Sequence, residues 1–211
     1  TLPYAKDYKR IGEGDVGLNT GGMGSISPVP FMDDEMYNKI EERIIKPTVA
    51  GLINERIKYK GFIFIGLINV NGNPYVIEYN VRMGDPETQV VLPRTKNDFL
   101  EILLAIENQN LDQLELEIDT NHYTNVVLAS KGYPESYNKG FIITGLEKIN
   151  QSTIFHAGTL LKGNVLTNGG RVISVVSSSE NFKEALKKSY ESIDLIEFEG
   201  KTYRKDIGFD L

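Results

Sequence analysis

The stretch VIEYNVRMGDPETQ, residues 76 to 89, places an acid, an amide and a guanidinium at alternate positions. Because successive side chains of a β-strand point to opposite faces, Glu78, Asn80 and Arg82 would share one face, about 6.6 Å from one to the next. Carboxylate and amide oxygens suit Mg²⁺, which takes few protein ligands together with substrate phosphates. We therefore expect Glu78 and Asn80 to bind Mg²⁺ or Mn²⁺, and the Arg82 guanidinium to hold a phosphoryl or carboxylate oxygen.

The same polar face has a structural interpretation, because half-exposed antiparallel strands often carry solvated polar residues. Asn is depleted in strands, however, and a buried Glu-Asn-Arg face would need partners, so the residue types favour a functional role. The Gly-Asp-Pro-Glu turn at residues 84 to 87 displays Asp85 and Glu87. These two acids are suited to binding an ammonium group.

Residues 6 to 24 combine bases with a run of glycines. The pattern G-x-G-x-x-G at residues 12 to 17 matches the dinucleotide fingerprint, but that fingerprint needs a strand before it and a helix after it, and neither is indicated here. Glycines let backbone N–H groups approach an anion, and Lys9 and Arg10 are placed to neutralise a phosphate. The alternative interpretation is a flexible surface loop with ordinary turn chemistry.

The composition narrows the classes of function. The 29 acids outnumber the 23 bases, giving a net charge of -6, which disfavours a nucleic acid partner. The absence of cysteine removes disulfides, thiolate zinc sites and cysteine nucleophiles, and it is compatible with a reducing cytoplasm, where we expect the protein to be located. Only two histidines are present, which disfavours a multi-histidine metal site. No apolar run approaches the ~18 residues of a membrane span.

Hydrophobic periodicity predicts the elements that must position these residues. A helix is expected from Asp33 to Lys58, interrupted at Pro47. The run GFIFIGLINV, residues 61 to 70, is apolar enough to predict a buried strand, and the Asn71-Gly72 turn makes residues 74 to 81 its antiparallel partner. A further helix is expected after Asn97 or Asp98.

After residue 108 the pattern becomes β-rich. Short strands are predicted at residues 125–130, 141–146, 154–161 and 171–177, followed by a helix at 181–193. An acidic connector near residues 112 to 120 suggests two domains, 1–112 and 113–211. The predicted fold class is α+β.

Several separated motifs carry a resemblance to a known family. The chain resembles the glycinamide ribonucleotide synthetases (phosphoribosylamine–glycine ligases) of the ATP-grasp superfamily. The motifs in chain order are D-Y-K-R, G-E-G-D-x-G-x-N-T-G-G-M-G, I-E-Y-N-x-R-x-G-D-P-E-T-Q, VVLASKGYP, FHAGT, TNGGRV and RKDIG. They cover essentially the whole chain, and their shared order is far more specific than any one of them. The resemblance implies the C-terminal part of an ATP-grasp domain followed by a small β-rich C-terminal domain.

The resemblance also implies a reaction of de novo purine biosynthesis. ATP phosphorylates the carboxylate of glycine, and 5-phosphoribosylamine attacks the acyl phosphate to give glycinamide ribonucleotide, ADP and phosphate. Glu78 and Asn80 match the magnesium ligands, Arg82 matches the arginine that steadies the phosphoryl group, and Lys9 and Arg10 match a basic loop beside the reacting phosphate.

Two further sets of residues are assigned to substrates by the same resemblance. Asp85 and Glu87 would orient the glycine amine. The loop near the phosphoribosylamine would comprise Asp15, Asn19, Thr20, Gly21, Gly22 and Met23. His156, in the Phe-His-Ala-Gly motif, is interpreted as structural.

The chain begins partway into the family pattern, without counterparts of the N-terminal substrate domain and the first half of the ATP clamp. We therefore expect a fragment that lacks the N-terminal half of the enzyme and has little or no ligase activity alone. Two alternatives stay open: another ATP-grasp carboxylate–amine ligase with a different amine substrate, and a non-catalytic binding module.

Overall fold

The computed structural model describes residues 1–211, and its chain forms two compact units. The first, called here the sheet unit, comprises residues 1–28, 85–95 and 118–211. The second, the hairpin unit, comprises residues 29–84 and 96–117. Both combine helices with antiparallel strands, which confirms the predicted α+β class. The units cross the predicted division into domains 1–112 and 113–211, which stays a prediction.

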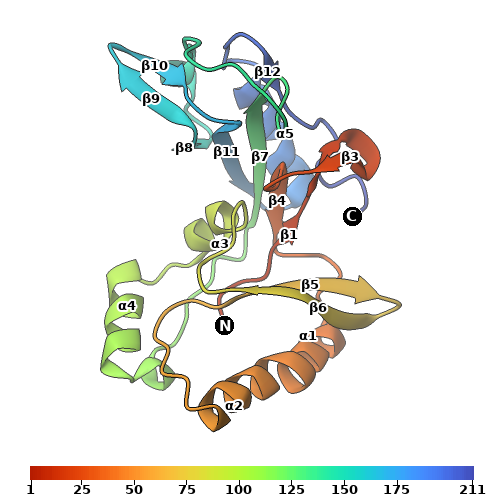
Figure 1. Ribbon diagram of the computed structural model, residues 1–211, viewed down its shortest axis with the longest axis vertical. Helices are drawn as coiled ribbons and strands as arrows, with labels where there is room; N and C mark the ends of the chain where they lie inside the picture. Colours follow the sequence, from red (N-terminus) through yellow and green to blue (C-terminus); the bar gives the residue numbers. More distant parts are fainter. The chain divides into compact units, whose positions relative to one another are not determined.

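The sheet unit is built around an antiparallel sheet of six strands with the order β1-β4-β7-β11-β8, in which β12 also pairs with β7 (Figure 1). These strands are β1 (Lys6–Asp7), β4 (Gly24–Ser27), β7 (His122–Ser130), β8 (Thr153–His156), β11 (Arg171–Ser179) and β12 (Lys201–Thr202). Two separate two-stranded ribbons are β2 (Arg10–Gly12) with β3 (Val16–Asn19), joined through the 3₁₀ turn η1 (Glu13–Asp15), and β9 (Thr159–Lys162) with β10 (Asn164–Thr167). A further 3₁₀ turn is η4 (Leu146–Lys148).

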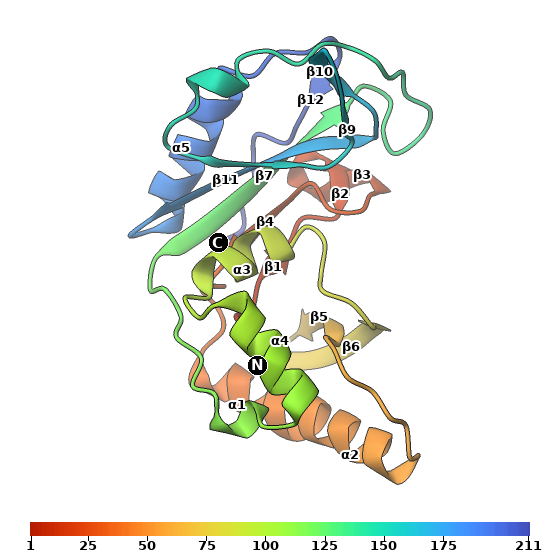
Figure 2. The same cartoon turned by 90° about the vertical axis from the view of Figure 1, so that its left-hand side faces the viewer.

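Helix α5 (Phe182–Ile193) lies along β7 and β11 and supplies one side of the core (Figure 2). The helix begins at Asn181, whose side chain accepts a hydrogen bond from Glu184 N, as expected of an N-cap residue. The buried core of this unit consists of Tyr8, Ile26, Val126, Leu128, Ile143, Val172, Ile173, Val175, Leu186, Ile193, Ile196, Phe198 and Ile207.

The predicted elements of the sheet unit are largely confirmed. The helix at 181–193 and the strands at 125–130 and 171–177 are present. The predicted strand 154–161 is divided into β8 and β9 by a turn at Ala157-Gly158, and residues 141–146 form only isolated bridges. Helix α3 (Thr88–Arg94), which packs against β4 and β7, was not predicted because it is short and contains Pro93.

The hairpin unit pairs β5 (Phe64–Val70) with β6 (Asn73–Asn80) through the predicted Asn71-Gly72 turn. Its helices are α1 (Asp34–Ile40), the π-helical turn η2 (Glu41–Ile45), α2 (Lys46–Asn54), α4 (Phe99–Asn108) and the 3₁₀ turn η3 (Leu111–Gln113). Asp33 caps α1, at the predicted start of the first helix, and Asp98, one of the two residues predicted to precede the next helix, caps α4. The predicted helix to Lys58 ends earlier, at Asn54. None of the helices in the chain combines the length and the hydrophobicity that crossing a bilayer requires.

The prediction that β5 is a buried strand is wrong for this structure. Ile68 is 50% exposed and Val70 is exposed as well, and on β6 Ile77 and Tyr79 are also exposed. A two-stranded ribbon buries a face only where another element covers it, and α1 packs against only part of β6. Apolar composition therefore predicted the strand but not what covers it.

A buried arginine anchors the N-terminal loop of the sheet unit to its C-terminal segment. The Arg204 guanidinium donates to both carboxylate oxygens of Asp206 at 2.8 Å and to Asp15 Oδ1 at 2.6 Å. It lies over the rings of Tyr8 and Phe209, and Arg204 as a whole is 1% exposed. Because a buried guanidinium is stable only when paired, these contacts hold η1 in place.

We expect Arg204→Met to lower the free energy of unfolding by roughly 3 kcal/mol, because Asp15 and Asp206 lose the cation between them. Urea unfolding followed by tyrosine fluorescence measures this loss. The matched control is Lys205→Met, since Lys205 is exposed. Equal losses in the two variants would contradict the anchoring role of Arg204.

Candidate functional site

In the hairpin unit, Glu78 and Asn80 lie on the same face of β6, as predicted. Glu78 pairs with Gly66 across the ribbon and Asn80 pairs with Phe64. A bulge lies one position earlier, where the pairing moves from Glu78 to Val76, so it does not separate the two residues. Glu78 is exposed. A Cβ on Gly66 would lie 3.1 Å from Glu78 Cγ, so the glycine leaves room for this side chain.

Strand β6 ends at Asn80, so Arg82 lies beyond the strand rather than on it. Its guanidinium turns back, donating to Met83 O at 2.8 Å and to Asn80 Oδ1 at 3.4 Å, a long hydrogen bond. Asn80 Nδ2 is buried without a hydrogen-bond partner. Arg82 itself is exposed, and its guanidinium lies beside the Asn80 amide oxygen.

The oxygens of Glu78 and Asn80 fit a hard cation that keeps several ligands from outside the protein. The structure contains no group of three or more His, Cys, Asp or Glu side chains placed to bind a metal. A cation at this face would therefore need water or phosphate oxygens to complete its shell, which is the mode of binding typical of Mg²⁺ with a nucleotide.

In the sheet unit, the glycine-rich loop is held by hydrogen bonds rather than left as an unsupported turn. Thr20 Oγ1 donates to Lys9 O at 2.8 Å and accepts from Gly22 N at 2.9 Å. Gly21 N donates to the Tyr133 hydroxyl at 2.9 Å. Met23 is buried, and its N–H donates to Tyr8 O. These contacts do not support the alternative interpretation of a flexible surface loop.

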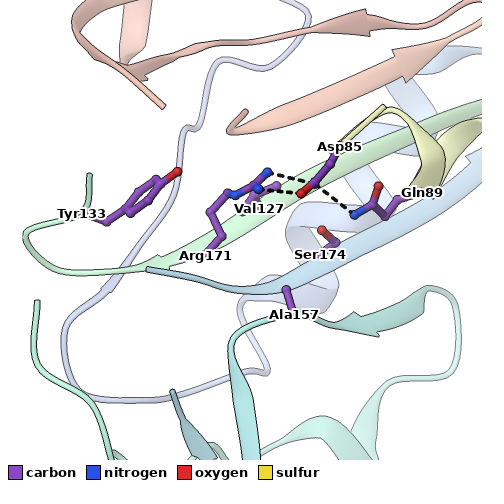
Figure 3. A pocket seen from close by; sticks show the side chains of 7 residues that line it. All are labelled: Asp85, Gln89, Val127, Tyr133, Ala157, Arg171 and Ser174. Carbon is purple, nitrogen blue, oxygen red and sulfur yellow. Dashed lines mark hydrogen bonds and ion pairs between the residues drawn. The ribbon is translucent and has the colours of Figure 1, made fainter. Parts of the chain in front are cut away.

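Arg171 on β11 ties the same loop to the turn before α3. Its guanidinium binds both carboxylate oxygens of Asp85, at 2.9 and 2.6 Å, and donates to Gly21 O at 2.8 Å. Figure 3 shows the two charged groups in contact with one another in the lining of a pocket of about 300 Å³. The pocket is lined by Asp85, Gln89, Val127, Tyr133, Ala157, Arg171 and Ser174. A bidentate arginine already neutralises Asp85, so Asp85 is a weaker partner for an amine than the turn sequence alone suggests.

Glu87, the second acid of that turn, is buried rather than displayed, with 7% of its surface exposed. Burial and the nearby charge of Asp7 raise the pKa of the Glu87 carboxyl to about 7. Burial also raises the pKa of Asp7, and Lys9, whose Nζ lies 3.0 Å from Asp7 Oδ2, opposes that shift. The two carboxyls therefore interact beneath the loop.

Most of the residues predicted to bind substrates thus lie in the sheet unit. Asn19 is exposed at the end of β3, Arg10 donates to Gly17 O at 2.9 Å, and Asp15 is engaged by Arg204. Glu78, Asn80 and Arg82 belong to the hairpin unit. His156 Nδ1 lies 3.1 Å from Thr159 Oγ1, a contact local to β8 and β9.

Sequence reasoning missed three residues of this region: Asp7, Tyr133 and Arg171. Asp7 opens the D-Y-K-R motif and Arg171 belongs to TNGGRV, so both lay within quoted motifs. Their partners are far away in the chain, with 86 positions between Asp85 and Arg171 and 112 between Gly21 and Tyr133. A pattern of neighbouring residues in the sequence cannot predict contacts between residues so far apart.

Gly22 should not tolerate a side chain, because its φ is +112° and a Cβ would lie 2.2 Å from Pro86 Cδ. We expect Gly22→Ala to lower the free energy of unfolding by roughly 2 kcal/mol or more. Gly14→Ala is the control, since Gly14 also has a positive φ but open space around it. Chemical denaturation compares the two variants. A loss no larger at Gly22 than at Gly14 would show that the contact with Pro86 is not restrictive.

Glu87→Gln should change how stability depends on pH. A carboxyl whose pKa is higher in the folded than in the unfolded protein stabilises the fold below the unfolded pKa of 4.5 and loses that contribution as pH rises to about 7. Relative to Glu87→Gln, the free energy of unfolding of the unaltered chain should therefore fall by about 2 to 3 kcal/mol between pH 4.5 and 7. Denaturant midpoints across this range measure the difference, and a constant difference would contradict the burial of an ionisable Glu87.

Comparison with known proteins agrees with the family resemblance of the sequence motifs. Residues 1–88 match the family model of the phosphoribosylglycinamide synthetase ATP-grasp (A) domain, and residues 123–210 match that of its C domain. A phosphoribosylamine–glycine ligase from Caldanaerobacter subterraneus subsp. tengcongensis is 48% identical over 98% of this chain and 50% of its own length. A bifunctional purine biosynthetic protein from Pichia angusta is 47% identical over 98% of this chain and 27% of its own length.

A solved structure gives the same result for the fold. The crystal structure of phosphoribosylamine–glycine ligase from Thermotoga maritima matches 97% of this chain and 51% of its own chain, with 42% identity and a TM-score of 0.87. The chain thus spans about half the length of the phosphoribosylamine–glycine ligases that it matches. The two family models, which together take in most of the chain, and the fold agree, and the chain belongs to the phosphoribosylglycinamide synthetase family of ATP-grasp proteins.

Proposed function

We propose that the protein carrying this chain ligates glycine to 5-phosphoribosylamine at the expense of ATP. The products would be glycinamide ribonucleotide, ADP and phosphate, and the step belongs to de novo purine biosynthesis. Family membership supports this proposal. The observation that carries it on structural grounds is the pair of an exposed Glu78 and a half-buried Asn80 on one face of β6, with the Arg82 guanidinium beside Asn80.

Each group at this face has a role that its chemistry supports. Glu78 and Asn80 would hold Mg²⁺ (or Mn²⁺), which when bound to ATP phosphates neutralises charge during phosphoryl transfer. Arg82 would stabilise the phosphoryl group as it moves to the glycine carboxylate. Phosphoryl transfer depends mainly on positioning and on charge neutralisation, so this site needs no histidine base.

The sheet unit would supply the amine side of the reaction. The backbone N–H groups and glycines of the Asn19–Met23 loop, together with Lys9, Arg10 and Asp15, would face the phosphoribosylamine or its product. Glu87 and Asp85 would face the glycine amine. The hydrogen bonds of Thr20 and Gly21 support the proposal, because a substrate loop must keep its geometry.

Three further expectations go with the ligase proposal. The remaining half of the enzyme would be the partner of this chain and would complete the ATP clamp. Residues 1–211 alone would then show little or no turnover, measured as ADP release that depends on glycine and phosphoribosylamine. The predicted cytoplasmic location fits this biosynthetic role and stays a prediction.

Substitution of Glu78 tests the metal and phosphate side directly. In the protein that carries this chain, we expect Glu78→Ala to weaken Mg²⁺-dependent ATP binding by at least about tenfold, because one of two metal ligands is removed. Isothermal titration calorimetry with and without Mg²⁺ measures the change. Glu55→Ala is the matched control, since Glu55 is an exposed acid of the same unit. Wild-type affinity in Glu78→Ala would favour a non-catalytic binding module.

A further inference from the structure

The N–H and the carbonyl of Gly21, in the glycine-rich loop of the sheet unit, are both bound by side chains from distant parts of the chain. The N–H donates to the Tyr133 hydroxyl at 2.9 Å, and the carbonyl accepts from Arg171 Nη1 at 2.8 Å. A Cβ on residue 21 would lie 2.8 Å from Arg171 Cζ. Only glycine therefore lets the backbone of the loop approach the guanidinium this closely.

The position of the Tyr133 hydroxyl is set by packing. A Cβ on Gly170 would lie 2.2 Å from Tyr133 Cδ2, so the tyrosine ring rests directly on the backbone of Gly170. Tyr137 packs edge-on against the same ring, with the ring centroids 6.3 Å apart. Tyr133 N also donates to the carbonyl of Ser130, the last residue of β7, at 3.1 Å. The hydroxyl is thus presented to the loop by a packed surface rather than by a free side chain.

The hydrogen bond to Tyr133 differs from the other hydrogen bonds that the loop N–H groups make. Of the four N–H groups at residues 20–23, three donate to acceptors within residues 8–20. The fourth, that of Gly21, donates to Tyr133, 112 positions away in the chain. The three local bonds shape the N-terminal segment itself, whereas the bond to Tyr133 fixes the place of the loop against the end of β7.

Both terminal nitrogens of Arg171 are engaged by the protein. Nη1 donates to Gly21 O and to Asp85 Oδ1, and Nη2 donates to Asp85 Oδ2. A bidentate pair of this kind fixes orientation as well as distance. Arg171 and Tyr133 line the same pocket (Figure 3) and lie in the motifs TNGGRV and VVLASKGYP, which have no part in the proposed chemistry so far.

We propose that Tyr133 is a positioning residue whose hydroxyl, together with the Arg171 guanidinium, holds the loop at Gly21 in the geometry that binds phosphoribosylamine. The inference rests on the proposed function and deepens it, because it assigns the alignment of that substrate to a side chain that acts through the loop. A misplaced loop weakens substrate contacts even when the contacting groups are intact. Arg171 also holds Asp85, which is proposed to face the glycine amine, so its loss should affect both amine substrates.

Tyr133→Phe in the full-length protein isolates the hydroxyl, because the ring can keep its place on Gly170. We expect the Gly21 amide to exchange its hydrogen at least about tenfold faster, since the N–H loses its acceptor. Hydrogen–deuterium exchange followed by NMR measures the rate. Tyr137→Phe is the matched control, because it removes the hydroxyl of the neighbouring ring while the loop N–H groups donate elsewhere. Exchange at Gly21 in this control should stay within about twofold of the wild type.

Steady-state kinetics separate positioning from a general structural role. Tyr133→Phe should raise the KM of phosphoribosylamine at least about tenfold and leave kcat and the KM values of ATP and glycine within about twofold. Arg171→Lys should raise the KM values of both phosphoribosylamine and glycine at least about tenfold, because lysine cannot hold Asp85 in a bidentate pair. Tyr137→Phe should leave all three KM values unchanged.

A folded Tyr133→Phe that leaves the KM of phosphoribosylamine unchanged overturns the inference while the proposed function stands. The same holds if this variant lowers kcat alone, raises all three KM values alike, or leaves the exchange at Gly21 unchanged. If Tyr133→Phe does not fold, Arg171→Lys decides, and an unchanged KM of phosphoribosylamine overturns the inference. A wild-type enzyme without glycine- and phosphoribosylamine-dependent ADP release overturns the proposed function instead, while the exchange at Gly21 still reports whether Tyr133 holds the loop.

Discussion

The alternation of side chains along β6 is the constraint on which the proposed chemistry depends. It places two oxygen donors, Glu78 and Asn80, on one face. Gly66 on the paired strand leaves space for Glu78, and the end of the strand at Asn80 lets Arg82 turn back toward it. One register of one ribbon therefore gathers the proposed metal-binding pair and a guanidinium, a combination suited to phosphate groups rather than to a generic solvated surface.

The sheet unit depends on a different kind of interaction, namely arginines that join distant segments. Arg171 connects β11 to the glycine-rich loop and to Asp85, and Arg204 connects the C-terminal segment to Asp15. Both guanidiniums make bidentate contacts with carboxylates, which fix orientation as well as distance. Their effect is to hold a loop of glycines, otherwise costly in conformational entropy, in one geometry over the buried pair Asp7 and Glu87.

Local signals in the sequence predicted much of the fold and part of the site. The caps at Asp33 and Asp98, the Asn71-Gly72 turn and the shared face of Glu78 and Asn80 depend on residues within a few positions of one another. The burial of Glu87 and the pairs Asp85–Arg171 and Asp15–Arg204 could not be predicted in this way. Their partners are 86 and 189 positions apart, and only the folded chain brings them together. The prediction that strand β5 is buried was wrong for a related reason, since the exposure of a strand depends on what packs over it.

The most direct test of the central claim is a crystal structure of the full-length protein with Mg²⁺ and a non-hydrolysable ATP analogue. The account predicts a magnesium ion about 2.1 Å from a carboxylate oxygen of Glu78 and from the amide oxygen of Asn80, with phosphate oxygens completing its shell. A nucleotide-bound magnesium held by other residues, with the Glu78 and Asn80 oxygens directed away from it, would contradict the account.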